Sequence, residues 1–170
     1  MTATTIPGGV LAPVATTFDV EGELDLASYK ANMQYYATSR LDGVVIMGSN
    51  GEYMLLDECE KVRLIEAGVE AIAGRKVVMA GTGVESTRGK ITLTQKAAEL
   101  GANFALLNTP HYYKPRYDHA ANLKHYQTVA EASPIPVIVY VMAAYTGVDL
   151  TSALVAELSK HPNIVGVKDS

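Results

Sequence analysis

Short apolar runs alternate repeatedly with longer helical patterns along this 170-residue chain, and this alternation limits the fold more than any other feature. The apolar runs, which we predict to be strands, are Val10–Thr16, Gly43–Gly48, Lys76–Gly81, Asn103–Asn108, Ile135–Val141 and Ile164–Val167. Most of them are continuously apolar, which is typical of parallel strands covered on both faces. The helical patterns between them are Leu26–Thr38, Glu58–Ala73, Arg88–Leu100, His119–Ala132 and Thr151–Lys160. The sequence therefore predicts a parallel α/β fold.

Two α/β architectures fit this alternation, the (β/α)₈ or TIM barrel and the doubly wound open sheet. A barrel has eight strands and typically about 250 residues, whereas the apolar runs here give six strands. We therefore expect residues 1–170 to form a single domain that is either a barrel truncated to about six βα units or a complete open sheet. The last strand is followed only by a few residues, which favours the incomplete barrel. Its unpaired edges would then be destabilising.

Composition excludes several classes of partner. The formal net charge is −4 and no basic run is present, which argues against nucleic acid or an anionic membrane surface. Cys59 is the only cysteine, so the sequence can form neither an internal disulfide nor a thiolate-rich metal site. No stretch has the length and apolarity of a membrane span, and the N-terminus has no signal-peptide pattern. From these features we predict a cytoplasmic protein.

Candidate site residues are sought where the strands end, because parallel α/β folds place their active sites at the carboxyl ends of the strands. The segment Gly48–Gly51 has two readings: a nest of backbone N–H groups suited to a carboxylate or phosphate, or an ordinary turn that needs glycine at positive φ. Gly81–Ser86 is explained by a turn and a helix cap. No P-loop and no GxGxxG motif is present, so nucleotide binding has little support.

Aromatic and histidine side chains also follow two of the strands. Tyr112 and Tyr113 lie in a loop between prolines, where either a functional or a surface-packing role is open. Tyr140 ends an apolar strand, where a phenol can relay protons or simply pack. His111 is interpreted as a loop histidine, because no second ligand stands at metal-binding spacing. The sequence therefore predicts no metal site.

Lys168 closes the last apolar run and also has two readings. Its ammonium group can extend to water along an apolar stem. Alternatively, apolar walls around it would lower its pKa, so that a neutral amine could attack a ketone carbon.

The order of these segments resembles the dihydrodipicolinate synthase/N-acetylneuraminate lyase family, and the resemblance covers essentially the whole chain. The matching segments are Gly48–Glu52 (GSNGE), Thr109–Pro115 (TPHYYKP), Tyr140 followed by Thr146–Leu150 (TGVDL), and Gly166–Ser170 (GVKDS). Within the family, the residues of these segments are most similar to those of 4-hydroxy-2-oxoglutarate aldolase and of fungal-type 2-keto-3-deoxy sugar acid aldolases.

The resemblance implies a TIM barrel and the chemistry of a class I aldolase. Lys168 would form an imine with the C2 ketone of pyruvate or of a 2-oxo acid, and Tyr140 would carry protons for imine formation and C–C cleavage. Ser49 would belong to the proton relay. Tyr112 would complete that relay, in this family usually from a neighbouring subunit, which implies a homo-oligomer such as a dimer or tetramer.

The resemblance also implies how the substrate is held. Gly48, Ser49 and Asn50 would bind the carboxylate of a small-molecule 2-oxo acid. The protonated imine is itself the electron sink, so neither a metal nor an organic cofactor is implied.

The chain departs from the family pattern after Tyr140, where Val141–Ala144 replaces the usual segment containing a proline. Tyr145 stands where dihydrodipicolinate synthases have an arginine, and Thr17 stands where the family has a proline. Tyr145 favours an aldolase for a neutral or hydroxylated aldehyde. The resemblance as a whole implies cleavage of a 4-hydroxy-2-oxo acid or a 2-keto-3-deoxy sugar acid to pyruvate or glyoxylate and a second carbonyl product. Two alternatives stay open: a dihydrodipicolinate synthase that condenses pyruvate with an aldehyde, and a truncated barrel without catalytic activity.

Overall fold

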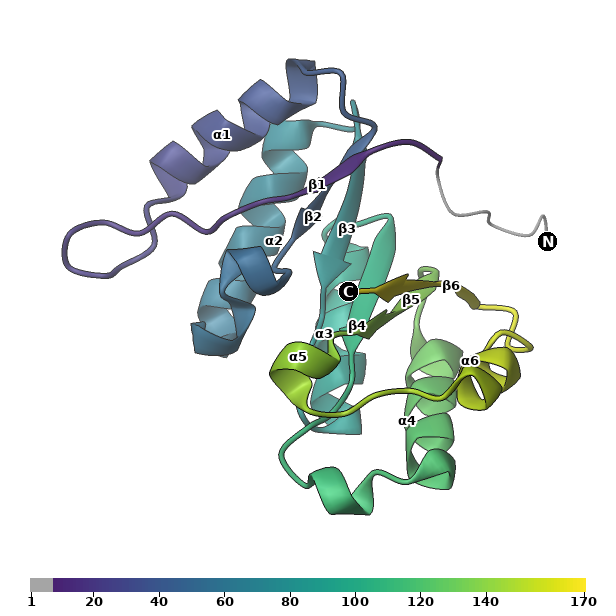
Figure 1. Cartoon of the computed structure of the whole chain (residues 1–170). Coiled ribbons are helices and arrows are strands. Elements are labelled where there is room, and N and C mark those ends of the chain that lie inside the picture. Colours follow the sequence, from purple (N-terminus) through teal and green to yellow (C-terminus); the bar gives the residue numbers. More distant parts are fainter. Residues whose placement is uncertain (1–7) are drawn as a thin grey trace.

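The fold is organised around one parallel sheet, shown in a computed structural model that describes residues 8–170. The strands are β1 (Leu11–Pro13), β2 (Gly43–Ile46), β3 (Val77–Gly81), β4 (Phe104–Asn108), β5 (Val137–Val141) and β6 (Ile164–Asp169). They are paired in chain order, β1-β2-β3-β4-β5-β6, and every pair is parallel. A doubly wound sheet reverses its strand order. The consecutive order is therefore that of a TIM barrel truncated to six of its strands, as one of the two sequence readings predicted (Figure 1).

Helices follow the strands and pack beside one another along the outside of the sheet. They are α1 (Leu26–Thr38), α2 (Glu58–Ile72), α3 (Thr87–Glu99), α4 (His119–Ala132), the short α5 (Ala143–Thr146) and α6 (Ser152–Leu158). Contacts join α1 to α2, α2 to α3, α3 to α4 and α4 to α6. Within residues 8–170, no helix combines the length and the apolar character that crossing a bilayer requires.

The start of α2 illustrates how local sequence fixes an element. The Asp57 side chain accepts a hydrogen bond of 2.7 Å from the backbone N–H of Glu60. The Glu60 carboxylate accepts one of 2.8 Å from the backbone N–H of Asp57. This reciprocal pair is a capping box, which satisfies two amides that the first turn of a helix leaves unpaired.

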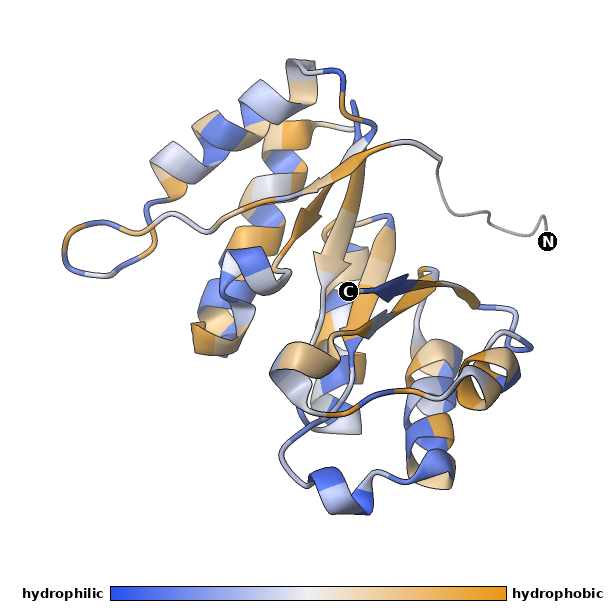
Figure 2. Cartoon of the chain, in the orientation of Figure 1, coloured by the Kyte–Doolittle hydropathy of each residue, from blue (hydrophilic) through white to orange (hydrophobic). Residues whose placement is uncertain are grey.

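The apolar residues of the strands pack on both faces of the sheet. In β4, Ala105 and Leu107 join the cluster beneath the helices, whereas Phe104 and Leu106 join a second cluster on the opposite face. Successive strand residues point to opposite faces, so a strand covered on both sides must be apolar at every position. Figure 2 shows the strands coloured largely as hydrophobic, with a hydrophilic end on β6.

Four local features differ from the sequence predictions. Strand β1 has only three residues, and β6 extends to Asp169, so that Lys168 lies within a strand. The helix α5 was not predicted. The segment after β2 forms a 3₁₀ turn, η1 (Ser49–Gly51), and positive φ occurs at Met47 and Glu52, both at 53°, rather than at its glycines. The reading of this segment as a turn that needs glycine at positive φ is therefore wrong.

Candidate active site

Three residues from three strand ends meet at the carboxyl edge of the sheet. Tyr140 in β5 is the register partner of Lys168 in β6. The Nζ atom of Lys168 lies 3.6 Å from the centroid of the Tyr140 ring. The Oγ atom of Ser49, which follows β2, lies 3.2 Å from the phenolic oxygen of Tyr140. Residues separated by up to 119 positions, the interval from 49 to 168, thus form one polar group.

Tyr140 is the centre of this group, and its side chain is only 4% exposed. Burial by itself raises the pKa of the Tyr140 phenol, but the neighbouring Lys168 and the Ser49 hydroxyl lower it by more, so the net shift is downward. A lowered phenol pKa eases proton transfer to and from the oxygen. The arrangement therefore suits Tyr140 to carrying protons beside an amine.

Lys168 has a second polar neighbour that the sequence reading did not include. Its Nζ donates a hydrogen bond of 3.1 Å to the Oγ atom of Ser170. Lys168 is half-buried, so its amine is accessible to a small molecule while its stem packs in the strand. A favourable interaction between an ammonium group and an aromatic face also holds it over Tyr140.

A cavity of about 290 Å³ opens beside Tyr140. Its lining consists of Ser49, Glu52, Tyr53, Met54, Leu55, Asn108, His111, Tyr140, Met142, Tyr145 and Thr146. Two predicted site residues, Ser49 and Tyr140, therefore line the cavity. Lys168 is not part of the lining, and its amine lies over the ring of Tyr140, which is. A volume of this size suits a small organic molecule.

The other predicted residues lie around this group without a polar contact to it. Gly48 is buried and precedes η1, whereas Asn50 within η1 is exposed. Tyr112 is 76% exposed and packs edge to face against Tyr113, with ring centroids 4.9 Å apart. Within this one chain, Tyr112 makes no hydrogen bond to Ser49 or Tyr140 among the described residues.

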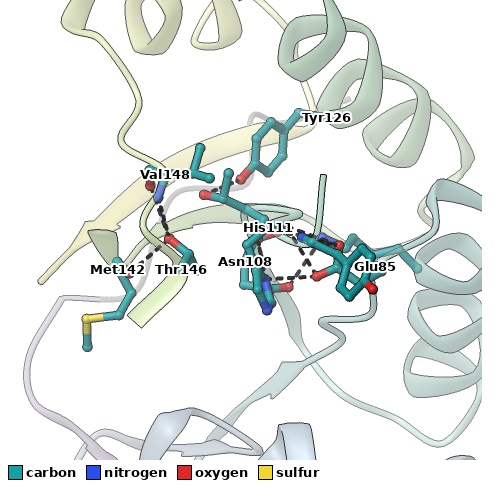
Figure 3. A network of polar contacts seen from close by, with 10 residues as sticks. Glu85, Asn108, His111, Tyr126, Met142, Thr146 and Val148 are labelled. Atoms are coloured by element: carbon teal, nitrogen blue, oxygen red, sulfur yellow. Dashed lines mark hydrogen bonds and ion pairs between the residues drawn. The ribbon is translucent and has the colours of Figure 1, made fainter. Parts of the chain in front are cut away.

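A carboxylate that the sequence reading assigned to a turn holds the Tyr112 loop in place. The Glu85 side chain accepts hydrogen bonds from the backbone N–H groups of His111 (3.1 Å) and Tyr112 (3.1 Å). The Nδ1 atom of His111 lies 2.9 Å from the same carboxylate. Figure 3 shows Glu85 and His111 pointing toward one another beside Asn108. His111 is therefore a loop histidine, as predicted, and its ring and backbone both contact the Glu85 carboxylate.

The segment after Tyr140 is held by a threonine, although it lacks the proline of the family pattern. The Thr146 hydroxyl donates to the backbone oxygens of Met142 (3.0 Å) and Val148 (3.1 Å) in alternative arrangements, and accepts from the N–H of Val148 (3.2 Å). Figure 3 shows these contacts among Met142, Thr146 and Val148. Helix α5 and Thr146 thus define the loop geometry at the cavity.

Sequence reasoning missed Glu85, Asn108, Thr146 and Ser170 as members of the site. The first two were visible at the ends of β3 and β4, where active-site residues are expected. Nothing in the linear sequence shows, however, that Asn108 lines the cavity or that Glu85 contacts His111, another residue of that lining. Among residues 8–170, no three His, Cys, Asp or Glu side chains gather as a metal ion would require.

Comparisons with known proteins agree with this geometry. Residues 6–170 match the model of the dihydrodipicolinate synthetase family. The chain is 40% identical over 162 residues to the 4-hydroxy-tetrahydrodipicolinate synthase of Xanthomonas campestris, covering 95% of this chain and 53% of that protein. It is 39% identical over 165 residues to a probable mitochondrial 4-hydroxy-2-oxoglutarate aldolase of Emericella nidulans, covering 94% and 53%.

A solved structure shows the same fold. The chain superposes on the chloride-inhibited dihydrodipicolinate synthase of Acinetobacter baumannii in complex with pyruvate, with a TM-score of 0.91 and 34% identity. The match covers 95% of this chain and 55% of that one, so this chain spans about half the length of the relatives it matches. By its matching family model, its strand order and its strand-end residues, the chain belongs to the dihydrodipicolinate synthetase family.

Proposed function

We propose that this protein is a pyruvate-dependent class I aldolase or lyase in which Lys168 forms the covalent imine. The observation that carries the proposal is the position of the Lys168 amine, 3.6 Å from the Tyr140 ring, together with the Ser49 hydroxyl on the Tyr140 phenol. An amine nucleophile beside a proton carrier is the arrangement that imine formation needs. The family and the named relatives support it further.

The proposed reaction begins with attack of the Lys168 amine on the C2 ketone of a 2-oxo acid. The ketone oxygen takes one proton from the amine nitrogen and one from the Tyr140 phenol, and it leaves as water when the protonated imine forms. In the cleavage direction, Tyr140 accepts the proton of the C4 hydroxyl, and the C3–C4 bond breaks to release an aldehyde or an oxo acid. The bonding electrons move into the imine to give an enamine. Tyr140 passes the proton that it accepted to C3, and water then hydrolyses the imine, which releases pyruvate and restores both the Lys168 amine and the Tyr140 phenol.

The polar turn after β2 completes the proposed site. Ser49 relays protons to Tyr140, and Gly48, Ser49 and Asn50 hold the carboxylate of the 2-oxo acid. Tyr112 completes the relay in a neighbouring copy of the chain. Its 76% exposure supports that role, because an exposed aromatic side chain on a fixed loop can reach into a second subunit.

Two candidate functions share the imine chemistry and differ in the direction of the reaction and in the compound that reacts. Cleavage of a 4-hydroxy-2-oxo acid or of a 2-keto-3-deoxy sugar acid is supported by the similarity to the Emericella nidulans protein. Condensation of pyruvate with an aldehyde is supported equally by the similarity to the Xanthomonas campestris protein. Tyr145 lines the cavity at the position where an arginine was expected for a synthase, and this favours a substrate without a carboxylate at that point.

Borohydride reduction in the presence of pyruvate tests the shared chemistry. The expected result is a stable adduct, detected by intact mass and mapped to Lys168, that is absent in Lys168→Ala. Lys160→Ala, at an exposed lysine in the turn before β6, is the matched control and should form the adduct normally. A folded wild-type chain that forms no adduct would favour the alternative of a non-catalytic barrel. Separate incubations with 4-hydroxy-2-oxoglutarate and with a 2-keto-3-deoxy sugar acid, each followed by assay of pyruvate, then separate cleavage from condensation.

A further inference from the structure

Lys90 is a completely buried lysine that the proposed reaction does not use. It lies in the first turn of α3, its side chain is 0% exposed, and burial lowers its pKa to about 7, against an opposing effect of Glu85. Among the described residues, no carboxylate lies within ion-pair distance of its amine. The amino end of a helix also disfavours a positive charge. A buried amine in this place therefore requires a specific partner.

That partner is Asn108, the last residue of β4. Lys90 Nζ lies 2.5 Å from the backbone oxygen of Asn108 and 3.3 Å from its Oδ1 atom. Leu106, two residues earlier, accepts from Thr82 on the β3 side. Carbonyls two residues apart in a strand point to the same side, so the oxygen of Asn108 also faces β3. Because β3 ends at Gly81, that oxygen has no strand partner, and Lys90 supplies the donor instead.

The contact with Lys90 also fixes which way the Asn108 amide points. An amine donates hydrogen bonds, so the side-chain atom that faces it is the oxygen. The Nδ2 atom must then face away, and its only acceptor among the described residues is Thr109 O at 3.3 Å. One of its two N–H groups is therefore left for another acceptor. Asn108 lines the cavity beside Tyr140, and Figure 3 shows it next to His111, another residue of that lining.

Close packing also confines the amide, whose orientation the Lys90 contact sets. A Cβ atom added at Gly83 would lie 2.3 Å from Asn108 Oδ1 and 2.8 Å from the Tyr53 ring, so the asparagine oxygen and the tyrosine both pack directly against this glycine. The Asn108 side chain is thus confined between Gly83 and Lys90. Its free N–H is a fixed donor and not a rotating one.

From this geometry we infer that Asn108 is a specificity-determining residue, whose amide N–H binds an oxygen of the substrate beyond the C3–C4 bond, and that Lys90 is its positioning residue. The inference rests on the proposed function and deepens it. The ligand class is a 2-oxo acid that carries a hydroxyl or carbonyl oxygen on its distal part. A site built to donate to such an oxygen discriminates against an analogue that lacks it, because the donor is then left unpaired.

The test uses two acids that differ by one oxygen, 2-oxopentanoate and 5-hydroxy-2-oxopentanoate. Neither has a C4 hydroxyl, so neither undergoes the cleavage. In an NMR titration of the ¹⁵N-labelled chain, the Asn108 side-chain amide resonances should shift with the hydroxylated acid and stay in place with the other. Absence of a shift with the hydroxylated acid overturns the inference.

Borohydride trapping of the same two acids measures the preference and examines Lys90. For the wild-type chain, the concentration of acid that gives half-maximal trapping should be about fivefold to tenfold lower for the hydroxylated acid than for 2-oxopentanoate. This is the effect expected of one hydrogen bond. Asn108→Leu should abolish the preference, and Lys90→Met should reduce it without lowering trapping of 2-oxopentanoate. Lys61→Met, at another buried lysine that does not contact Asn108, is the control. Equal loss for both acids in Lys90→Met would show a merely structural role.

Failure of the proposed function is recognised separately. If no acid forms an adduct at Lys168, the imine chemistry is wrong, but the NMR titration still decides whether Asn108 binds the hydroxylated acid.

Discussion

The amine of Lys168 lies over the ring of Tyr140, 3.6 Å from its centroid, although the two residues belong to different strands. They are register partners in the β5–β6 ladder. The pairing of these strands therefore sets the distance between the proposed nucleophile and its proton carrier. The Ser49 hydroxyl contacts the far end of the same tyrosine, so the phenol lies between an amine and a hydroxyl.

Tyr140→Phe should slow imine formation by about 10²- to 10⁴-fold, the usual contribution of a general acid or base. The ring that lies beneath Lys168 is retained, so thermal stability should change little. The rate of borohydride-trapped adduct formation measures the effect. Tyr35→Phe, at a tyrosine of α1 that is 72% exposed and lies outside the cavity lining, serves as the control and should react at nearly the wild-type rate. An equal loss in both variants would contradict the role of the Tyr140 hydroxyl.

Glu85→Gln should loosen the loop that carries Tyr112. Two backbone N–H groups and His111 Nδ1 contact the Glu85 carboxylate, and hydrogen bonds to a charged acceptor are stronger than those to a neutral amide. Hydrogen exchange at the amides of His111 and Tyr112 should accelerate roughly tenfold, as expected for a loss of about 1.4 kcal/mol. Glu99→Gln, on the exposed side of α3, should leave both rates unchanged. Unchanged exchange in Glu85→Gln would show that the carboxylate does not hold the loop.

The stability of the wild-type chain should rise with pH relative to Lys90→Met between pH 7 and 10.5. Burial lowers the pKa of Lys90 to about 7 in the folded protein, from 10.5 in the unfolded chain. In this window the unfolded chain binds more protons, so the free energy of unfolding increases by up to about 1.4 kcal/mol per pH unit. Denaturant titrations across this range measure the difference. Parallel curves for the two proteins would mean that Lys90 stays charged in the fold.

His125 should make the fold sensitive to acid. Burial, with a contribution from Lys90, lowers the pKa of His125 to about 3, from 6.5 in the unfolded chain. The unfolded chain binds the extra proton between these values, so stability should fall as the pH falls from 6.5 toward 3. His125→Gln should show a flatter decline in denaturant titrations, whereas His119→Gln, at an exposed residue of the same helix, should follow the wild type. A decline as steep as the wild-type one in His125→Gln would refute the assignment.

Gly83→Ala should disturb the cavity wall. Its added methyl group would lie 2.3 Å from Asn108 Oδ1 and 2.8 Å from the Tyr53 ring, so one of these side chains must move. We expect a loss of about 1–3 kcal/mol in the free energy of unfolding, typical of overpacking. Gly8→Ala has no atom within 4 Å of the added carbon and should be neutral. Chemical denaturation compares the three proteins, and a neutral Gly83→Ala would show that the wall is more adaptable than described.

Several elements could be read from residues close together in the chain. The capping box of Asp57 and Glu60 is a local pattern, and it was confirmed at the start of α2. The apolar runs predicted the strands, because strands buried on both faces need apolar residues throughout. The turn after β2 was misread. Positive φ in this segment occurs at Met47 and Glu52, although neither is glycine. Sequence patterns do not reveal such exceptions.

The sequence by itself determined the α/β class, the family and the residues at the strand ends, since these depend on periodicity and on short motifs. Only the tertiary structure decided that the strands pair in chain order, as in a barrel, and that Glu85 holds the Tyr112 loop. It also decided that Lys90 donates a hydrogen bond to the backbone carbonyl of Asn108, which β3 leaves unpaired. These relationships join residues from different βα units, and their distances follow from strand register and helix packing, which no local pattern specifies.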